Sequence, residues 1–532
     1  MPDLQILPRT AQSSRRLDAW ALPVLATVVL LAGLLVIKID RAEPTLRALV
    51  IQTLSAKFDS KVELDSFQVS VAKGLLVSGS GLRLYGKSDP NHHQLGVQPL
   101  ISVTEFSFRM GLLELFRPTK HVNTVYVQGL ALNLPPREQR AEIRALGHKP
   151  GKIGIAVDRL ICDRVLLVIN TLKPGKLPVE FDIESLQMTD VGSSGPMHFD
   201  ARLTNPKPVG EIVSSGDFGP WQADSARDTP VRGAYTFQNA DLSTIRGIGG
   251  RLDSSGKYSG TLDRIEVDGT TDTPDFRLAV SGRPVPLHTE FHAIVDGTSG
   301  DTYLHPVKAA LANTLLVATG SVVRTKEPSG HHVELSVLIE KGRIEDILKL
   351  AVHTEPPMLT GAVRLKTQLD LPPSDLEVPY RLRLKGSFAV SGAHFSNNKI
   401  QRKVDALSMR SQGKPELATD EIPDNMRSVM TGAFRLNEGK ISFSQLQYRV
   451  PGTRVDLTGT YSLDGNQFDF HGHARLDAKL SHMVTGWKSI LLKPADPFFS
   501  KHGVGTEIPV RINGTKSEPH FGLDFGHKSG KN

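Results

Sequence analysis

The stretch Val267-Asp268-Gly269-Thr270-Thr271-Asp272-Thr273-Pro274-Asp275-Phe276-Arg277-Leu278 closely parallels a second stretch, Ile512-Asn513-Gly514-Thr515-Lys516-Ser517-Glu518-Pro519-His520-Phe521-Gly522-Leu523. A looser form, in which Gly and a small residue precede alternating apolar residues, recurs at Gly233, Gly361, Gly386, Gly432 and Gly459. We expect each of these glycines to turn the chain, and the strand that follows to place every second side chain on one face. Stacked units of this kind predict a long, quasi-repetitive antiparallel sheet.

The same period of two runs along most of the chain. It starts at Val62 and Leu64, and turn signals interrupt it about every 8 to 15 residues. The composition agrees, because 47 glycines and 34 prolines accompany only 6% aromatic and 22% charged residues. We therefore predict a mainly β protein whose elongated, curled sheet carries a few short capping helices.

A different pattern precedes the strands. Residues 19–37 contain no charge, and at about 1.5 Å of helical rise per residue they span about 28 Å, close to the thickness of a bilayer core. We predict a transmembrane anchor over residues 17–39, with Trp20, Leu25, Leu30 and Leu35 among its membrane-facing residues. A cleaved secretory signal is disfavoured because no small-x-small site follows. The basic residues on the two sides slightly favour a cytoplasmic segment 1–16.

The remaining chain divides into three β regions, at residues 42–136, 153–355 and 356–532, with a polar linker at 137–152. Within the first region, apolar spacing over residues 44–58 predicts an amphipathic helix that either caps the sheet, which we favour, or lies on the outer membrane face. Two more helices are predicted, over residues 344–351 and 480–492, each followed by proline.

Charge and cysteine content narrow the function. The net charge of +7 is spread among acids, so the sequence predicts no nucleic-acid partner. A mixed solvated surface and a weak preference for anionic lipid headgroups both fit this pattern. Cys162 is the only cysteine, so no internal disulfide is possible; its apolar context predicts a small buried side chain rather than a nucleophile.

No constellation of catalytic or metal-binding residues is readable. The pairs His92-His93 and His331-His332 lie in turn-like stretches, and we expect solvated side chains. His471 and His473 would share one strand face, which makes them the better metal candidates. The acidic turns at 253–256 and 296–301 are typical of ordinary strand connections rather than calcium sites. Since no Gly-x-Ser-x-Gly elbow or P-loop is present, we predict no enzyme activity, cofactor or metal.

Several segments together resemble the AsmA family of bacterial envelope proteins, which is related to the long β-groove lipid-transfer proteins. The resemblance rests on the N-terminal anchor and on the segments 62–81, 127–132 and 247–250. It also rests on a C-terminal block, 432–523, which contains the segments 450–453 and 491–499. It implies an inner-membrane-anchored protein with most of its chain in the periplasm. It also implies a groove concerned with moving lipid, in particular phospholipid, or with outer-membrane homeostasis.

Two functions remain open. In the first, apolar side chains at Val69, Phe108, Phe237 and Phe434 line a groove that binds or conducts lipid. In the second, the chain is an envelope assembly factor or scaffold that contacts outer-membrane or periplasmic proteins and carries no lipid. A closed sandwich core and a lipid-filled groove produce the same alternating pattern, so the sequence leaves both.

Overall fold

The computed structural model describes most of the chain from residue 61 onward. The described residues are 44, 47–48, 51–52, 55, 61–70, 75–85, 99–111, 119–134, 154–170, 174–191, 195–220, 226–352, 355–418, 427–464, 467–484, 493, 505–515 and 518–523. They form a mainly β protein with few helices, as predicted. The predicted anchor, with Trp20, Leu25, Leu30 and Leu35, and the linker 137–152 lie outside these residues. None of the helices in the described part has the length and hydropathy of a membrane span.

The chain forms two compact units. The first comprises residues 1–134, 139–166 and 186–194, and the second comprises 135–138, 167–185 and 195–532. Two long strands, β6 (Gly154–Ile169) and β7 (Val179–Val191), are divided between them. The two units are therefore not consecutive segments of the chain.

The first unit is an antiparallel sheet in which one strand pairs with three others. Its strands are β1 (Val62–Glu63), β2 (Ser66–Ser70), β3 (Leu75–Leu84), β4 (Ile101–Met110) and β5 (Thr119–Leu134). Strand β3 pairs with β1, β2 and β4, and β4 pairs with β5. Leu64, Phe67 and Val77 form its buried apolar cluster.

A helical segment packs on this cluster. All described residues between 44 and 55 are helical, which agrees with the helix predicted over 44–58. Ile51 packs against the cluster, and the Arg47 guanidinium donates a hydrogen bond to the Leu64 carbonyl oxygen. The described residues of the segment thus contact the buried cluster of the first unit's sheet, while its role as a cap at the sheet end stays a prediction.

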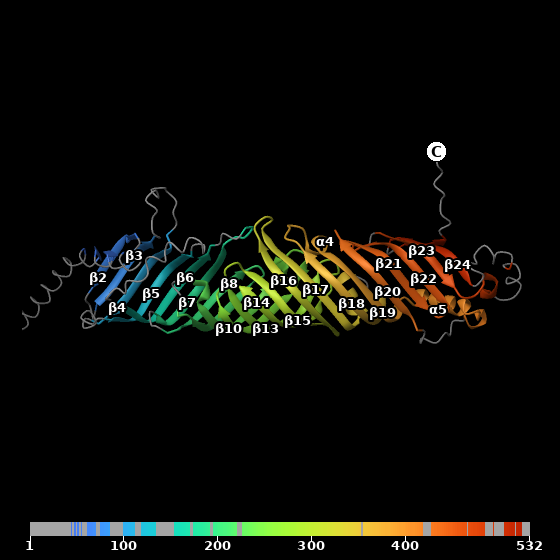
Figure 1. The fold of residues 1–532 in the computed structure, drawn as a ribbon, viewed down its shortest axis with the longest axis horizontal. Coiled ribbons are helices and arrows are strands. Elements are labelled where there is room, and N and C mark those ends of the chain that lie inside the picture. Colours follow the sequence, from blue (N-terminus) through green and yellow to red (C-terminus); the bar gives the residue numbers. More distant parts are fainter. Residues whose placement is uncertain are drawn as a thin grey trace, which may run out of the picture. The chain divides into compact units, whose positions relative to one another are not determined.

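The second unit is an antiparallel meander that Figure 1 shows running in chain order from green to red. Its strands are β8 (Met197–Pro206), β9 (Val209–Phe218), β10 (Pro230–Asp241), β11 (Ile248–Gly249), β12 (Arg251–Thr261), β13 (Arg264–Leu278), β14 (Val285–Asp296), β15 (Asp301–Leu311), β16 (Thr314–Thr325), β17 (Gly330–Arg343), β18 (Leu359–Leu371), β19 (Arg383–Phe395), β20 (Val429–Asn437), β21 (Lys440–Val450), β22 (Thr453–Ser462), β23 (Phe468–Leu476), β24 (Thr506–Gly514) and β25 (Pro519–Leu523). From β8 onward each strand pairs with the next, except that β10 pairs with β12 while the short β11 pairs with β13.

Because successive strands run in opposite directions, their connections lie alternately at the two ends of the strands. We call these two ends of the sheet rim A and rim B. Rim A holds the connections 241–251, 278–285, 343–359 and 395–429, and rim B holds 218–230, 261–264, 296–301, 325–330 and 371–383. Most of the helical elements lie on rim A, namely η3 (Leu242–Thr244), α3 (Ile344–Ala351) and α5 (Asn398–Ser411). Rim B carries η2 (Ala226–Asp228) and α4 (Val378–Arg381).

The helix predictions have mixed outcomes. Helix α3 confirms the stripe predicted over 344–351. Helix α5 has no counterpart among the predictions, because it buries polar side chains such as Gln401 and Asp405 and so lacks an apolar stripe. The helix predicted over 480–492 is wrong at its start. Residues 480–483 form only a 3-10 turn, η5 (Leu480–Met483), and Val484 is extended, with φ −128° and ψ 154°.

The role predicted for the five repeated glycines is wrong at four of them; Gly361, with a φ of +146°, lies at a register shift in β18. Gly233, Gly386, Gly432 and Gly459 lie inside strands without positive φ, so they do not turn the chain. The two parallel twelve-residue stretches also fold differently. The first lies wholly within β13, whereas the second forms the β24–β25 hairpin, with Gly514 at a φ of +119°. Similar local sequences therefore do not both form a turn. A strand glycine either allows the backbone to bend or leaves room for a side chain of the neighbouring strand, and only the pairing of the strands decides which.

Candidate functional site

One face of the second unit's sheet carries half-buried apolar side chains. In β10, the half-buried Tyr235 and Phe237 alternate with the exposed Thr236 and Gln238. We call the face that carries Tyr235 and Phe237 the inner face. It continues through the cross-strand pairing to Phe388, Phe434 and Phe443. The sheet is curled, and the lower exposure of this face compared with the opposite one identifies it as the concave side.

Only part of the inner face is covered by packing. Ile339, Val363 and Val390 are at most 2% exposed and form a cluster at the rim A end of their strands. Side chains of α3 pack on this cluster, among them Ile344 and Ile347. Away from it, aromatic side chains of the inner face such as Phe388 and Phe434 are half-buried, whereas Ala293 and Leu436 are buried. The inner face therefore has a closed core at rim A and a mixture of buried and half-buried apolar side chains elsewhere.

A row of phenylalanines crosses the inner face between β19 and β23. The ring centroids of Phe434 and Phe388 lie 6.2 Å apart, and those of Phe388 and Phe443 lie 6.3 Å apart. Phe443 contacts Phe470 at 5.8 Å, and Phe470 contacts Phe468 at 6.4 Å. We call these five residues the phenylalanine row. Its centroid distances are those of favourable aromatic contacts.

The strands between these rings supply glycines. A Cβ atom on Gly432 would lie 2.7 Å from Cε1 of Phe388, and one on Gly459 would lie 2.6 Å from Cδ1 of Phe470. Each ring thus leans over a glycine of the adjacent strand and occupies the space that a side chain would fill. Rings in this position cover the backbone of the adjacent strand, and all five rings of the row are half-buried.

Two tyrosines use the same arrangement in β10 and β12. A Cβ atom on Gly233 would lie 2.6 Å from Oη of Tyr258, and one on Gly256 would lie 2.8 Å from Cε1 of Tyr235. Burial raises the pKa of both tyrosines, so both hydroxyls are protonated at neutral pH. This part of the inner face is therefore aromatic but polar.

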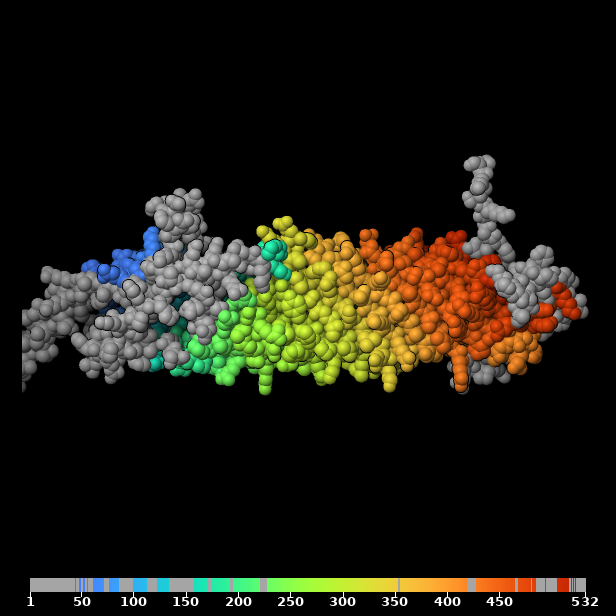
Figure 2. Space-filling view, in the orientation of Figure 1, coloured from blue at the N-terminus to red at the C-terminus, as the bar shows by residue number. Residues whose placement is uncertain are grey.

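Rim A meets rim B at one place, and the β6–β7 connection contacts rim B at another. The Val378 amide on rim B donates a hydrogen bond of 3.0 Å to the Arg246 carbonyl oxygen on rim A, and the Arg246 guanidinium donates one of 3.0 Å to the Asp375 carbonyl oxygen. In the connection between β6 and β7, Lys176 Nζ lies 2.8 Å from Asp301 Oδ1 and 2.6 Å from the Arg324 carbonyl oxygen, both on rim B. These contacts link connections that are many strands apart, so the sheet curls far enough to bring its edges together. In the view of Figure 2, the green to orange residues of this unit form a continuous surface.

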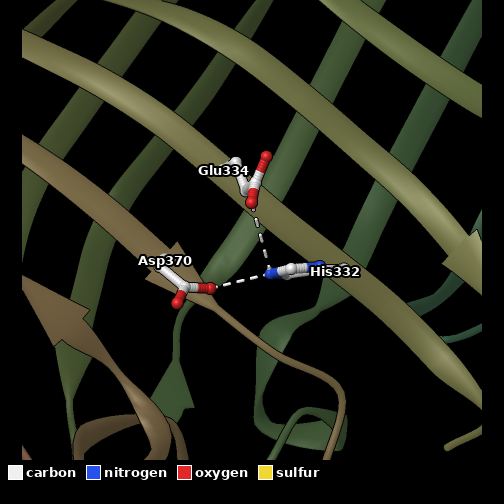
Figure 3. A group of neighbouring side chains, drawn as sticks. All are labelled: His332, Glu334 and Asp370. Atoms are coloured by element: carbon white, nitrogen blue, oxygen red, sulfur yellow. Dashed lines mark hydrogen bonds and ion pairs between the residues drawn. The ribbon is translucent and has the colours of Figure 1, made fainter.

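A separate group of ionisable side chains lies on the opposite, outer face (Figure 3). His332 Nε2 lies 2.7 Å from Asp370 Oδ1 and 3.8 Å from Glu334 Oε1. Single ligand atoms of the three lie within 4.8 Å of one another, so together they could hold a divalent cation. However, Arg383 also pairs with Asp370, at 3.4 Å. Among the described residues of this unit, three other His–Asp pairs each join two adjacent strands, namely His198–Asp217, His288–Asp272 and His292–Asp268.

The sequence does not reveal this group, because Asp370 lies 38 residues from His332 and only the β17–β18 register places it opposite Glu334. His471 and His473 are both exposed on one face of β23, as predicted. There, His471 Nε2 lies 3.2 Å from Thr458 Oγ1. The outer face thus combines histidines with polar partners on adjacent strands.

The other predicted positions fall in different places. Val69 and Phe108 both pack against the buried cluster of the first unit. Phe237 and Phe434 lie on the inner face of the second unit, in strands far apart in the sheet. Cys162 is 1% exposed, and burial raises the pKa of its thiol to about 11, as expected for a structural side chain.

No protein-family model matches the chain, and no curated protein sequence matches it.

Proposed function

We propose that the inner face of the second unit binds the acyl chains of membrane lipid, in particular phospholipid. The observation that carries this proposal is the phenylalanine row, whose rings lean over glycines and stay half-buried on the inner face. Apolar surface left in water costs about 25 cal/mol per Å² relative to covered surface, and an acyl chain is an apolar cover that requires no hydrogen bonds. Binding could serve storage or conduction along the face.

The proposed setting is the bacterial inner membrane. The apolar segment 17–39 would anchor the chain, most of which would lie in the periplasm, in keeping with the resemblance to AsmA proteins. Such a protein would contribute to outer-membrane homeostasis, with an outer-membrane or periplasmic partner. Its action would be non-enzymatic and would need no cofactor.

Photo-crosslinking in cells tests the proposal. A photoreactive residue at Phe237 or Phe434 lies on the inner face, whereas one at the exposed neighbour Thr236 or Arg435 does not. We expect lipid adducts from the first pair and few from the matched second pair. Adducts to protein alone at Phe237 and Phe434 would contradict lipid binding.

A second candidate function is an envelope assembly factor or scaffold without lipid. The observation that favours it is the packed part of the apolar surface, where Val69, Phe108 and the α3 cluster form ordinary cores. Substitution of Phe434→Glu separates the two functions. If lipid covers the ring, the protein should stay folded and lose bound lipid; if protein covers it, the protein should unfold, as we expect for Val363→Glu at the buried cluster.

A further inference from the structure

Four hydroxyl side chains gather on the inner face across β9, β10 and β12. The Tyr258 hydroxyl lies 2.7 Å from Ser214 Oγ, and the Tyr235 hydroxyl lies 3.1 Å from Ser254 Oγ. We call Ser214, Tyr235, Ser254 and Tyr258 the hydroxyl patch. All four are partly buried on the concave side, where a bound lipid would reach them.

The direction of each hydrogen bond follows from proton counting. Ser214 Oγ donates its only proton to the Ala234 carbonyl oxygen at 3.0 Å, so Tyr258 must be the donor to Ser214. By the same logic, Ser254 Oγ donates to the Thr270 carbonyl oxygen at 2.9 Å, so Tyr235 is the donor to Ser254. Every proton of the hydroxyl patch is therefore used within the protein. Its oxygens retain lone pairs, so the patch can only accept hydrogen bonds from a ligand.

Charge on the inner face does not change this preference. The inner-face residues of β9, β10 and β12 in register with the patch are uncharged, namely Ile212, Gly216, Gly233, Phe237, Leu252 and Gly256. Next to it, Thr271 Oγ1 and Thr289 Oγ1 lie 2.6 Å apart, and because one must donate to the other, a single hydroxyl proton remains. The remaining threonine proton can be donated to a phosphate oxygen of a lipid headgroup. The oxygens of the hydroxyl patch can accept a hydrogen bond from a donor group next to that phosphate.

From this accounting we infer that the hydroxyl patch selects lipids whose headgroup donates hydrogen bonds, through an ammonium or a hydroxyl group. The inference rests on the proposed lipid binding and names the headgroup class. A quaternary ammonium headgroup lacks a donor and would leave the remaining lone pairs of the tyrosine and serine oxygens without a hydrogen bond. Discrimination should come from the oxygens, because the aromatic rings attract both kinds of ammonium.

A competition experiment with the full chain tests this inference. The purified protein is incubated with vesicles that contain equal amounts of phosphatidylethanolamine and phosphatidylcholine with identical acyl chains, and bound lipid is quantified by mass spectrometry. We expect phosphatidylethanolamine to be enriched about fivefold, the effect of about one hydrogen bond. A parallel mixture of phosphatidylglycerol and phosphatidylcholine asks whether a hydroxyl donor is selected as an ammonium donor is.

The variant Y235F/Y258F keeps both rings and removes only the phenolic oxygens. It should bind as much total lipid as the wild type and lose the enrichment, whereas Y303F, at an exposed tyrosine, should keep it. Equal binding of phosphatidylethanolamine and phosphatidylcholine by the wild type, or an enrichment that survives in Y235F/Y258F, would overturn the inference while lipid binding stands. If the wild type binds no lipid, both the proposed function and the inference fail.

Discussion

Two regions of the inner face use one backbone arrangement for different surfaces. In β10 and β12, tyrosine rings lean over Gly233 and Gly256, and their hydroxyls bond to serines. In the strands from β19 to β23, phenylalanine rings lean over Gly432 and Gly459 and contact one another. The glycines fix where the rings lie, and the residue type fixes the polarity. A curled sheet can thus change its chemistry along its length without changing its backbone.

The rims beside the tyrosine region and the phenylalanine region also differ. Beside β10 and β12, rim A meets rim B through Arg246 and Val378. Beside β19 and β20, rim A carries α5, whose Ser408 hydroxyl donates a hydrogen bond of 2.6 Å to the Pro451 carbonyl oxygen in the connection between β21 and β22. The tyrosine region is therefore bordered by a contact between the rims, and the phenylalanine region by a helix. Substitutions in each region should have separable effects.

Among the substitutions that compare the two regions of the inner face, the largest effect is expected from breaking the contact of Lys176 with Asp301. Lys176 and Asp301 have side chains only 14% and 10% exposed, so Lys176→Ala leaves a carboxylate with little access to water. We expect a loss of about 3 kcal/mol in the free energy of unfolding, measured by denaturant titration. Hydrogen exchange should rise at the rim B ends of β15 and β16 and stay unchanged in β20–β23.

The matched control is Arg264→Ala, which removes a well-exposed ion pair with Glu266 and should change stability little. Equal destabilisation by the two substitutions, or faster exchange in β20–β23 after Lys176→Ala, would mean that the two regions do not respond independently.

A smaller effect is expected from filling the space under a ring. In Gly432→Ala the new methyl group would meet Phe388 at 2.7 Å, so the ring must move towards the concave side. We expect a cost of about 2 kcal/mol, measured by thermal unfolding. Gly522→Ala in β25 meets nothing within 4 Å and serves as the control. A neutral Gly432→Ala would show that the ring does not need this position.

The next substitution compares an open surface with a core. Phe443 is half-buried in the phenylalanine row, whereas Phe67 is 6% exposed in the first unit's cluster. Phe443→Ala should cost about 1 to 2 kcal/mol without lipid, less than the 3 to 5 kcal/mol that is typical of a buried phenylalanine and that Phe67→Ala should show. Equal costs in lipid-free protein would indicate that the row is an ordinary core.

The smallest effect is expected on the outer face. His332 and Asp370 are each about one-third exposed at their side chains, so solvent screens their pairing. His332→Ala should cost less than about 1 kcal/mol and leave the amount of bound lipid unchanged. Zinc titration monitored by thermal unfolding provides the check. A large zinc-dependent rise in the wild-type melting temperature that disappears in His332→Ala would instead assign a metal-binding role to the group.

The sequence predicts what depends on neighbours along the chain. Alternating residues identify the strands, the apolar context of Cys162 identifies a buried thiol, and the stripe at 344–351 identifies α3. It does not predict what depends on register between strands. From the sequence, the repeated glycines suggest turns, because the sequence does not show which residues lie opposite them. The pairing of Gly432 with Phe388 explains why a glycine is needed inside a strand. For the same reason, His332 and Asp370 seem unrelated until β17 and β18 are aligned.

The contacts that join distant connections have a consequence for the order of folding. Adjacent strands of the second unit pair as successive hairpins, which close short loops and can form as the chain is delivered. The contacts of Arg246 with Asp375 and of Lys176 with Asp301 and Arg324 join residues 129, 125 and 148 positions apart. They can form only after the intervening strands have assembled. None of these three hydrogen bonds belongs to a strand ladder, so the ladders do not depend on them.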